Sequence, residues 1–297
     1  MRPYLFVFIL LSSVSCKKNQ NECSTTNTVN LDLLPSSIDH TTDGFNTVYS
    51  ENLTSVSREI TTDQIPDHNY GVTGMNAVTK TFEMTLYPTQ NSTPTPIADN
   101  TGINWIFGIA LNGVTLSPGV PMPYTNTANG SKNWNWTLEG TFNTKTLGLD
   151  DNYAHMKDST GGYHYHGDFI NYASALGADG SSMVLCGWAA DGFPIYYRYA
   201  YSNADNIASP VEEMTSSYLQ KTGVRPGDGE SAPCNKYNGV FTQDFEYIEG
   251  QGDLDECNGR YGKTPEFLGG TYYYVITRDF PMIPRMFKGT PNISFSY

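Results

Sequence analysis

The feature that most constrains the fold of this chain is an internal similarity between two distant stretches. Three blocks recur in the same order: residues 149–155 resemble 254–260, residues 161–166 resemble 270–275, and residues 192–195 resemble 279–282. Ordered recurrence is typical of a repeated supersecondary unit. It predicts two related β-units, packed about a pseudo-twofold axis. The alternative is that strands rich in glycine and tyrosine resemble one another through composition alone.

The segments around these blocks have the pattern of β-strands. Residues 82–87 and 133–137 alternate apolar and polar side chains, which is the period of a half-buried strand. Residues 103–111 are more continuously apolar, as in a buried strand, and end at the turn signal Asn112-Gly113. The 28 glycines and 17 prolines are spread along the chain and disfavour long helices. Two short helices are expected, at 173–176 and 210–219. We therefore predict a mainly β fold, either a sandwich or barrel or an α+β fold with few short helices.

The N-terminus has the pattern of an export signal. Arg2 precedes an apolar run over residues 5–11, which is too short to span a bilayer permanently. Small residues then lead directly to Cys16, as in a bacterial lipoprotein cleavage site. The predicted organisation is a signal peptide over 1–15, a flexible tether over 16–45 that starts at a lipidated Cys16, and a β-rich domain over 46–297. The alternative is a plain secretory signal with an incidental cysteine.

Lipidation would place the domain in the cell envelope, on the outer membrane, its periplasmic face or the cell surface, held to the bilayer by acyl chains. The chain has 17 basic and 30 acidic residues and a net charge of −13. Such a surface repels phosphate backbones, so nucleic acid is not an expected partner. The sequence does not indicate an oligomeric state.

Four cysteines follow Cys16, and an exported compartment permits them to pair. Four cysteines allow three pairings. Cys234–Cys257 would close the shortest loop in the folded part, whereas Cys23 lies in the tether. Cys186 has apolar neighbours, which favour a buried thiol over a reactive thiolate.

Histidines are few and clustered, since three of the five fall within residues 155–166. His164 and His166 are two residues apart, so in a strand they point to the same face with Cβ atoms about 6.6 Å apart. Imidazoles at that spacing can converge on one ion at about 2.0–2.1 Å per Zn–N bond. A hairpin turn over the polar residues 157–162 would return His155 to the same place. The alternative is that these are half-exposed histidines bonded to the backbone.

Other polar residues suggest weaker possibilities. Asp168 and Asp191 could orient a ligating imidazole, or act as general base if the site is hydrolytic, although each could equally cap a turn. An oxygen-rich calcium site is conceivable at an acidic turn, but the spacing is not that of an EF-hand. Its residues are Asp253, Asp255 and Glu256. Arg285 and Lys288 could hold an anion or form ordinary surface pairs.

Taken together, these motifs resemble the YHYH domain family, over roughly residues 60 to 290. The matching segments are 65–68, 108–114, 163–166, 191–196, 254–260 and 287–289. The resemblance implies no established activity. It does imply that His68, His155, His164 and His166 all lie in family motifs, so His68 is a fourth candidate ligand. The chain departs from the family pattern at Asn152, where cysteine is common.

Three functions therefore compete. The first is an exported, lipid-anchored protein that binds zinc or copper through His155, His164 and His166, with a role in metal handling. The second is a metal-dependent hydrolase that uses a metal-bound water. The third is a surface module that binds glycans or peptides through its many tyrosines and four tryptophans. In the repeated unit Arg260, Tyr273 and Val275 replace the three histidines, which predicts that only the first unit carries the site.

Overall fold

The structure, a computed structural model, describes residues 48–70, 77–156 and 162–297. It confirms the predicted mainly β fold, with only two short α-helices among these residues. The predicted signal peptide, the tether and Cys16 lie outside the described residues. In the described ranges, no helix has the length and apolarity needed to cross a bilayer.

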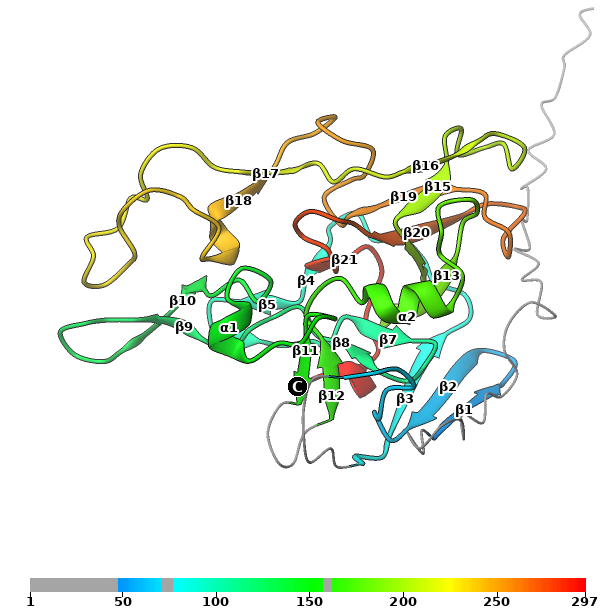
Figure 1. Cartoon of the computed structure of the whole chain (residues 1–297), viewed down its shortest axis with the longest axis horizontal. Helices are drawn as coiled ribbons and strands as arrows, with labels where there is room; N and C mark the ends of the chain where they lie inside the picture. Colours follow the sequence, from blue (N-terminus) through cyan, green and yellow to red (C-terminus); the bar gives the residue numbers. More distant parts are fainter. Residues whose placement is uncertain (1–47, 71–76, 157–161) are drawn as a thin grey trace, which may run out of the picture.

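The central sheet has eight strands and curls into half a barrel (Figure 1). In spatial order they are β11 (Ala154–Met156), β12 (Tyr163–Tyr165), β8 (Thr115–Leu116), β7 (Gly108–Ala110), β13 (Leu185–Ala189), β14 (Pro194–Tyr197), β20 (Thr271–Ile276) and β19 (Gly259–Gly262).

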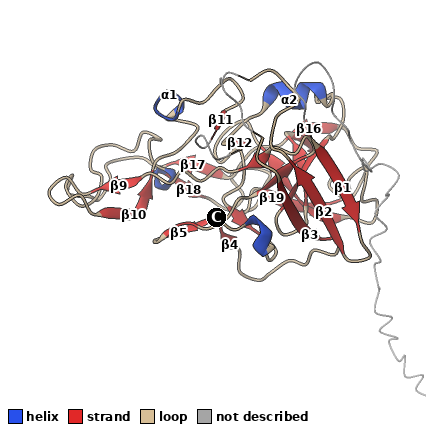
Figure 2. Ribbon diagram, turned by 90° about the horizontal axis from the view of Figure 1, so that it is seen from below, coloured by secondary structure: helices blue, strands red, loops and turns tan. Residues whose placement is uncertain are grey.

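Smaller elements surround this sheet. One small sheet has three strands, β1 (Tyr49–Leu53), β2 (Ser57–Thr62) and β3 (Lys80–Thr85). The two-stranded pairs are β4 (Thr95–Pro96) with β21 (Met286–Phe287), β5 (Ala98–Asp99) with β6 (Gly102–Ile103), β9 (Pro123–Thr125) with β10 (Lys132–Thr137), β15 (Tyr199–Tyr201) with β16 (Val211–Glu213), and β17 (Tyr218–Gln220) with β18 (Phe245–Tyr247). The helices are α1 (Thr144–Leu147) and α2 (Ile170–Ala175), and two 3₁₀ turns span Thr242–Asp244 and Ile293–Phe295. Figure 2 shows the β9–β10 pair at one end of the molecule and the β1–β3 sheet at the other.

The strand order of the central sheet reads the same from either edge. From each edge inward the pairings are antiparallel, parallel and antiparallel, and the two halves meet at the antiparallel pair β7–β13. At the meeting point Ile109 lies opposite Trp188, flanked by the pairs Gly187–Ala110 and Ala189–Gly108. A pseudo-twofold axis therefore passes between Ile109 and Trp188, as the internal similarity predicts.

Two glycines at this axis are required by close backbone approach. A Cβ on Gly108 would lie 2.4 Å from the carbonyl oxygen of Trp188, and a Cβ on Gly187 would lie 2.5 Å from that of Ile109. Both distances are below any real Cβ contact, so only glycine fits at either position. The two halves thus meet through the same sterically constrained contact.

The first two blocks of the internal similarity are structural counterparts. His155 pairs with His164 in β11–β12, and Arg260 pairs with Tyr273 in β19–β20. The turn before each outer strand is also repeated. Asp150 and Asp255 each accept a hydrogen bond at 2.9 Å from the backbone amide two residues later. Each also accepts from the hydroxyl of a tyrosine in the strand that pairs with the outer strand, at 2.6 and 2.8 Å.

The third block is not a structural counterpart. Residues 192–195 turn into β14, and their counterpart is 113–116, because Gly192 and Gly113 occupy the same turn of the hairpins β13–β14 and β7–β8. Residues 279–282 instead form a turn that follows β20. The prediction that 192–195 corresponds to 279–282 is therefore wrong, although the repeat itself is present.

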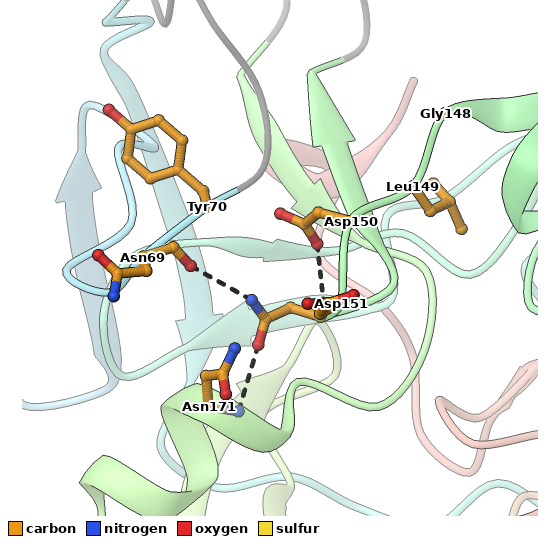
Figure 3. Close-up of a pocket in the computed structure, with 8 residues that line it drawn as sticks. Asn69, Tyr70, Gly148, Leu149, Asp150, Asp151 and Asn171 are labelled. Carbon is orange, nitrogen blue, oxygen red and sulfur yellow. Dashed lines mark hydrogen bonds between the residues drawn. The ribbon is translucent and has the colours of Figure 1, made fainter.

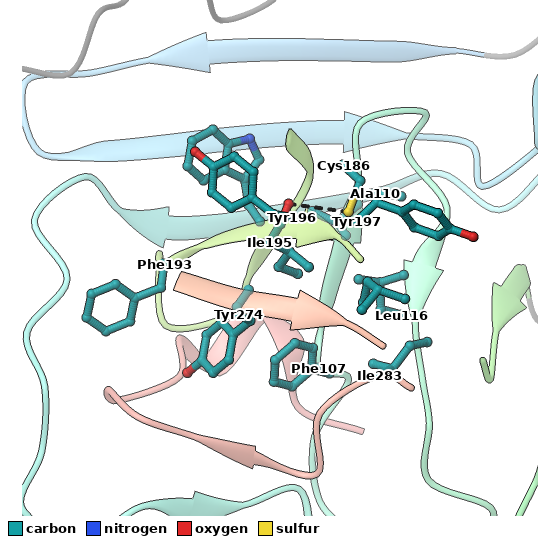
Figure 4. Close-up of a cluster of buried hydrophobic side chains, with 14 of the residues drawn as sticks. Phe107, Ala110, Leu116, Cys186, Phe193, Ile195, Tyr196, Tyr197, Tyr274 and Ile283 are labelled. Carbon is teal, nitrogen blue, oxygen red and sulfur yellow. Dashed lines mark hydrogen bonds between the residues drawn. The ribbon is translucent and has the colours of Figure 1, made fainter. Parts of the chain in front are cut away.

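The core is built from aromatic side chains of both halves (Figure 4). Buried tyrosine hydroxyls need polar partners, and the sequence supplies them. Tyr274 donates to Asp191 at 2.5 Å, and Tyr196 lies 2.5 Å from Glu266. The high tyrosine content is therefore used mainly for packing around the sheet.

Local sequence patterns identify two of the strands and one of the helices. The alternating segments 82–87 and 133–137 coincide with β3 and β10, and the helix expected at 173–176 overlaps α2. The helix expected at 210–219 is wrong. That stretch contains β16 and the start of β17, which pair with β15 and β18.

The predicted Cys234–Cys257 disulfide is absent, and both thiols are free. Cys257 is fully buried in the turn before β19, where burial raises the pKa of its thiol. Cys234 lies in the loop between β17 and β18, close to Gly229. The shortest closure in sequence is therefore not a contact in space. Cys186 is buried and its thiol donates to the Ile195 carbonyl at 3.3 Å, as expected for a structural cysteine.

Candidate metal centre

The outer hairpin of the first half places three histidines on one face. In the β11–β12 pair His155 lies directly opposite His164, and His166 follows two residues further along. Side chains two residues apart in a strand share a face, so all three rings meet on the side opposite Tyr163 and Tyr165. His164 and His166 are buried, and His155 is half-buried. Residues 157–161 of the hairpin turn expected over 157–162 lie outside the described residues.

The three rings are arranged almost symmetrically. Their centroids are 4.9 Å apart for His155 and His164, 5.0 Å for His155 and His166, and 4.8 Å for His164 and His166. One ring nitrogen from each residue lies within 4.8 Å of the other two. No other group of three His, Cys, Asp or Glu side chains with such spacing occurs in the part of the chain that the structure describes. The convergence predicted for His155, His164 and His166 is therefore present.

Two of the rings have their tautomer fixed by the backbone. The Nδ1 atom of His155 lies 2.6 Å from the Leu147 carbonyl oxygen, and that of His164 lies 3.1 Å from the Gly162 carbonyl oxygen. A carbonyl only accepts, so each neutral ring carries its proton on Nδ1. Their Nε2 atoms then present lone pairs. This is the arrangement in which a second partner orients a metal-ligating histidine.

His166 differs from the other two rings. Its Nδ1 atom is buried, and no hydrogen bond of normal geometry reaches it from the described residues, although the Pro118 carbonyl lies near. Its Nε2 atom is 3.2 Å from the Nε2 atom of His155. That separation is close to the edge, about 3.3 Å, of a tetrahedron with Zn–N bonds of about 2.0–2.1 Å. Without an ion, His166 must donate from Nε2 to the lone pair of His155.

The surroundings favour the uncharged form of His155 and His166. Burial lowers the pKa of His166 well below its ordinary value, and the neighbouring His164, His155 and Arg285 act in the same direction. Burial also lowers the pKa of His155, against the opposing effects of the Leu147 carbonyl and Asp150. Neutral imidazole is the form that binds metal, so the site is ready for an ion at neutral pH.

His68 does not join this group. Its Nδ1 atom lies 2.8 Å from the Asn69 carbonyl oxygen, its Nε2 atom lies 2.5 Å from the Tyr165 hydroxyl, and its ring stacks on Tyr165. Because Tyr165 points to the opposite face of β12 from His164, His68 lies on the wrong side of the sheet for ligation. The prediction of His68 as fourth ligand is wrong, and its role is to pack and bond in the core.

The two predicted accessory acids, Asp168 and Asp191, bond to residues outside the histidine group. Asp168 accepts from the Tyr197 hydroxyl at 2.5 Å and forms a buried ion pair with Arg198. Asp191 belongs to the second half, where it accepts from Tyr274 and from the Gly289 amide at 2.8 Å. Neither carboxylate is in the histidine group, so neither orients its rings.

Arg285 and Lys288 do not form a joint anion site. The Lys288 ammonium lies 3.5 Å from Asp255, whereas Arg285 is buried beside Glu139 at 2.7 Å. The acidic turn is explained by local bonds. Asp253 accepts from the Thr215 amide and hydroxyl, at 2.7 and 2.6 Å, and Asp255 caps its own turn. These bonds favour the capping interpretation over a calcium site, and the Glu256 backbone carbonyl accepts from the Tyr218 hydroxyl at 2.7 Å.

A polar pocket of about 330 Å³ lies next to the β11 turn (Figure 3). Its walls include Asn69, Asp150 and Asn171, and none of its lining residues is a histidine. Asn152 donates to the Asn69 carbonyl at 3.4 Å and accepts from the Asn171 amide at 3.2 Å. Asn152 therefore links its own turn to the loop at Asn69 and to the first turn of α2.

Sequence reasoning missed the carbonyl groups that orient the histidines. Helix α1 ends at Gly148, which has φ of 65° and is in the left-handed conformation. The chain turns there, and the preceding Leu147 carbonyl meets His155. A glycine directly after a short polar helix is the signal that could have indicated this turn.

The comparison with known families agrees with these features. The family model described as YHYH protein matches residues 81–289, a span that includes both halves of the central sheet and all three converging histidines. No curated protein and no solved structure matches the chain. Since the matched span is most of the chain, this protein belongs to the YHYH protein family.

Proposed function

We propose that this protein binds one transition-metal ion through His155, His164 and His166. The observation that carries the proposal is the convergence of three ring nitrogens within 4.8 Å, with two rings held by backbone carbonyls in the tautomer needed for ligation. The set fits the ion chemically, because all three donors are imidazoles and burial lowers the pKa of His155 and His166. An ion bound there would polarise any further ligand as a Lewis acid.

Imidazole donors suit Zn²⁺ or Cu²⁺, and ligand type alone does not separate the two. A bound ion would also change His166. To present its Nε2 lone pair, this ring has to carry its proton on Nδ1. The buried Nδ1 atom, which makes no bond of normal geometry now, would then gain a role.

We place this function in metal handling at the cell envelope. The sequence supports export, by its short apolar run, and lipid attachment, by small residues directly before Cys16. A lipid anchor would hold the histidine centre near a membrane surface, where an exported protein meets metal ions from outside. Handling needs binding and release only, which three neutral imidazoles supply.

Hydrolysis is less well supported. A metal-dependent hydrolase needs a positioned base, and the two acids proposed for that role, Asp168 and Asp191, are each bonded to tyrosines away from the histidines. A glycan-binding module needs exposed rings that form a platform. The exposed aromatic side chains in the described ranges come from separate segments: Tyr87, Phe142, Tyr261 and Tyr297.

The test is metal analysis of the purified protein. After loading with Zn²⁺ or Cu²⁺ and desalting, we expect about one ion per chain for the wild type. His164→Ala and His166→Ala should each lose the ion. His68→Gln is the matched control, because it removes a histidine on the other face of β12, and it should retain the ion. Equal metal content in all four proteins would contradict the proposal.

A further inference from the structure

A second site is indicated on the side of the molecule formed by β4, β21, β17 and β18, which are labelled in Figure 1. These elements line a cavity of about 310 Å³. Cavities of this size are in the lower range of small-molecule sites. The histidines of the metal centre do not line it.

The cavity contains an under-bonded buried cation. The Arg285 side chain lines the cavity and is only 10% exposed, and its Nη2 atom pairs with Glu139 at 2.7 Å. Its Nε and Nη1 atoms are buried and have no hydrogen-bond partner among the described residues. The guanidinium also lies over the Phe280 ring, 5.3 Å from its centroid. A ring face does not replace two missing acceptors, because a buried donor that makes no hydrogen bond is unfavourable.

A second cation lines the same cavity. The Lys221 ammonium donates to the Gln243 carbonyl at 3.0 Å, and it has no carboxylate partner in the part of the chain that the structure describes. No acidic residue appears in the cavity wall. The cavity wall therefore carries positive charge, although the chain as a whole has a net charge of −13. Such a wall favours an anionic ligand.

The rest of the wall is apolar and aromatic. Phe245 and Phe280 stack face to face, with centroids 3.9 Å apart and planes within 4°, and both line the cavity. Ile97, Ile103 and Met286 add aliphatic surface. A hydrated inorganic anion has no apolar surface to bury against such a wall. An anion with an apolar body does, and burial of that surface favours binding.

We propose that this cavity binds a small organic carboxylate with an aromatic body, its carboxylate on a free N–H group of Arg285 and near Lys221, and its ring against the Phe245–Phe280 pair. A carboxylate oxygen accepts strongly from a charged N–H donor, which explains why an arginine would be kept buried here with donors unused. This site goes beyond the metal function and does not depend on it.

The experiment is calorimetric titration of the purified protein with 3-phenylpropionate and with its uncharged amide as matched ligand. We expect saturable binding of the acid with a Kd of about 1 mM or tighter, and binding of the amide at least about tenfold weaker. Lys221→Gln should lower the affinity for the acid about tenfold, and Arg285→Gln should abolish binding of the acid. Arg278→Gln, which removes an exposed arginine paired with Glu213 elsewhere, should bind as the wild type does.

Equal affinity for acid and amide would overturn the proposal, as would the absence of acid binding at about 10 mM ligand. If Arg285→Gln does not fold, Lys221→Gln carries the test, because the partly buried Lys221 side chain makes a single bond. His164→Ala should bind the acid unchanged. A negative result here therefore leaves the metal proposal standing, and loss of metal binding leaves this one standing.

Discussion

The two halves of the central sheet share a backbone and differ in what their outer hairpins carry. Where the first half has His155 opposite His164, the second has Arg260 opposite Tyr273. In the second pair Arg260 donates to the Tyr273 hydroxyl at 2.6 Å and to the Tyr201 carbonyl. The fold is therefore compatible with either set, and the convergence of three imidazoles in the first half is not a requirement of the architecture.

The same contrast occurs one layer inward. Asn112 in the first half and Asp191 in the second both precede the hairpin glycine and both contact a core tyrosine, Tyr165 or Tyr274. The first half uses a neutral amide there, with His68 completing the network. The second uses a buried acid, and burial raises its pKa to about 6. The core tyrosine of the half that carries the histidines thus contacts a neutral amide, whereas that of the other half contacts an acid.

The largest expected effect comes from giving the first half the residues of the second. The triple variant His155→Arg, His164→Tyr, His166→Val should lose metal affinity by at least about a hundredfold, since all donors are gone. It should still unfold cooperatively, because the second half supports those residues on the same backbone. Equilibrium dialysis with Zn²⁺, beside thermal unfolding, measures both. A variant that binds the ion as before would break the contrast between the halves.

The next effect concerns Asp191 and pH. Because its pKa is higher in the fold than the ordinary value of 3.8, the folded protein keeps a proton that the unfolded chain releases between about pH 4 and 6. This acid therefore makes stability fall as pH rises through that window and adds no further change above it. The shift of about 2 units corresponds to at most about 3 kcal/mol.

Asp191→Asn, which copies Asn112 into the second half, should remove that dependence. Relative to the wild type, its free energy of unfolding should increase by up to about 3 kcal/mol between pH 4 and 7. Urea unfolding at several pH values measures the difference. Parallel pH profiles for the two proteins would show that the acid is not held in its protonated form by the fold.

A smaller effect separates the two core tyrosines. Tyr274→Phe removes a donor to a carboxylate and an acceptor of the Lys288 amide at 2.6 Å, so it should cost about 2–3 kcal/mol. Tyr165→Phe removes the hydroxyl that contacts two neutral partners, His68 and Asn112. It should cost about 1–2 kcal/mol of unfolding free energy. Urea unfolding at pH 7 compares them. The opposite order would mean that the charged network in the second half is not the stronger one.

What the sequence predicted well is what depends on local periodicity. The alternation in residues 82–87 identifies β3, and the two-residue spacing of His164 and His166 gives their common face. What it missed depends on contacts between distant segments. His68 meets Tyr165 on the other face, and Arg285 meets Glu139 across 146 residues. No spacing rule encodes such contacts.

The failed repeat block and the failed disulfide have a related cause. Residues 192–195 and 279–282 are alike in sequence, yet only strand pairing shows that 113–116 is the true counterpart. Cys234 and Cys257 are close in sequence, yet one lies in a loop between β17 and β18 and the other in a buried turn. Similarity and proximity along the chain are weaker guides than the register of a sheet.

The smallest effect tests the support of the metal centre, which the first half alone has. Helix α1 ends at Gly148, while residues 249–253 in the second half contain no helix. Gly148→Ala meets no atom within 4 Å but strains a backbone with φ of 65° by about 1 kcal/mol. The turn should shift, and the Leu147 carbonyl should hold His155 less well. Because partners behind a ligand typically matter by about 10–100-fold, we expect a loss of about tenfold in metal affinity.

Gly177→Ala is the matched control, since Gly177 follows α2 with φ of 80° and also has no atom within 4 Å of the new Cβ. It should carry the same backbone cost and leave metal affinity unchanged. Competition with a chromophoric zinc chelator measures both variants. If both lose affinity equally, general destabilisation explains the loss. If only Gly148→Ala loses affinity, the Leu147 carbonyl is part of the site, and the first half differs from the second in its support as well as its ligands.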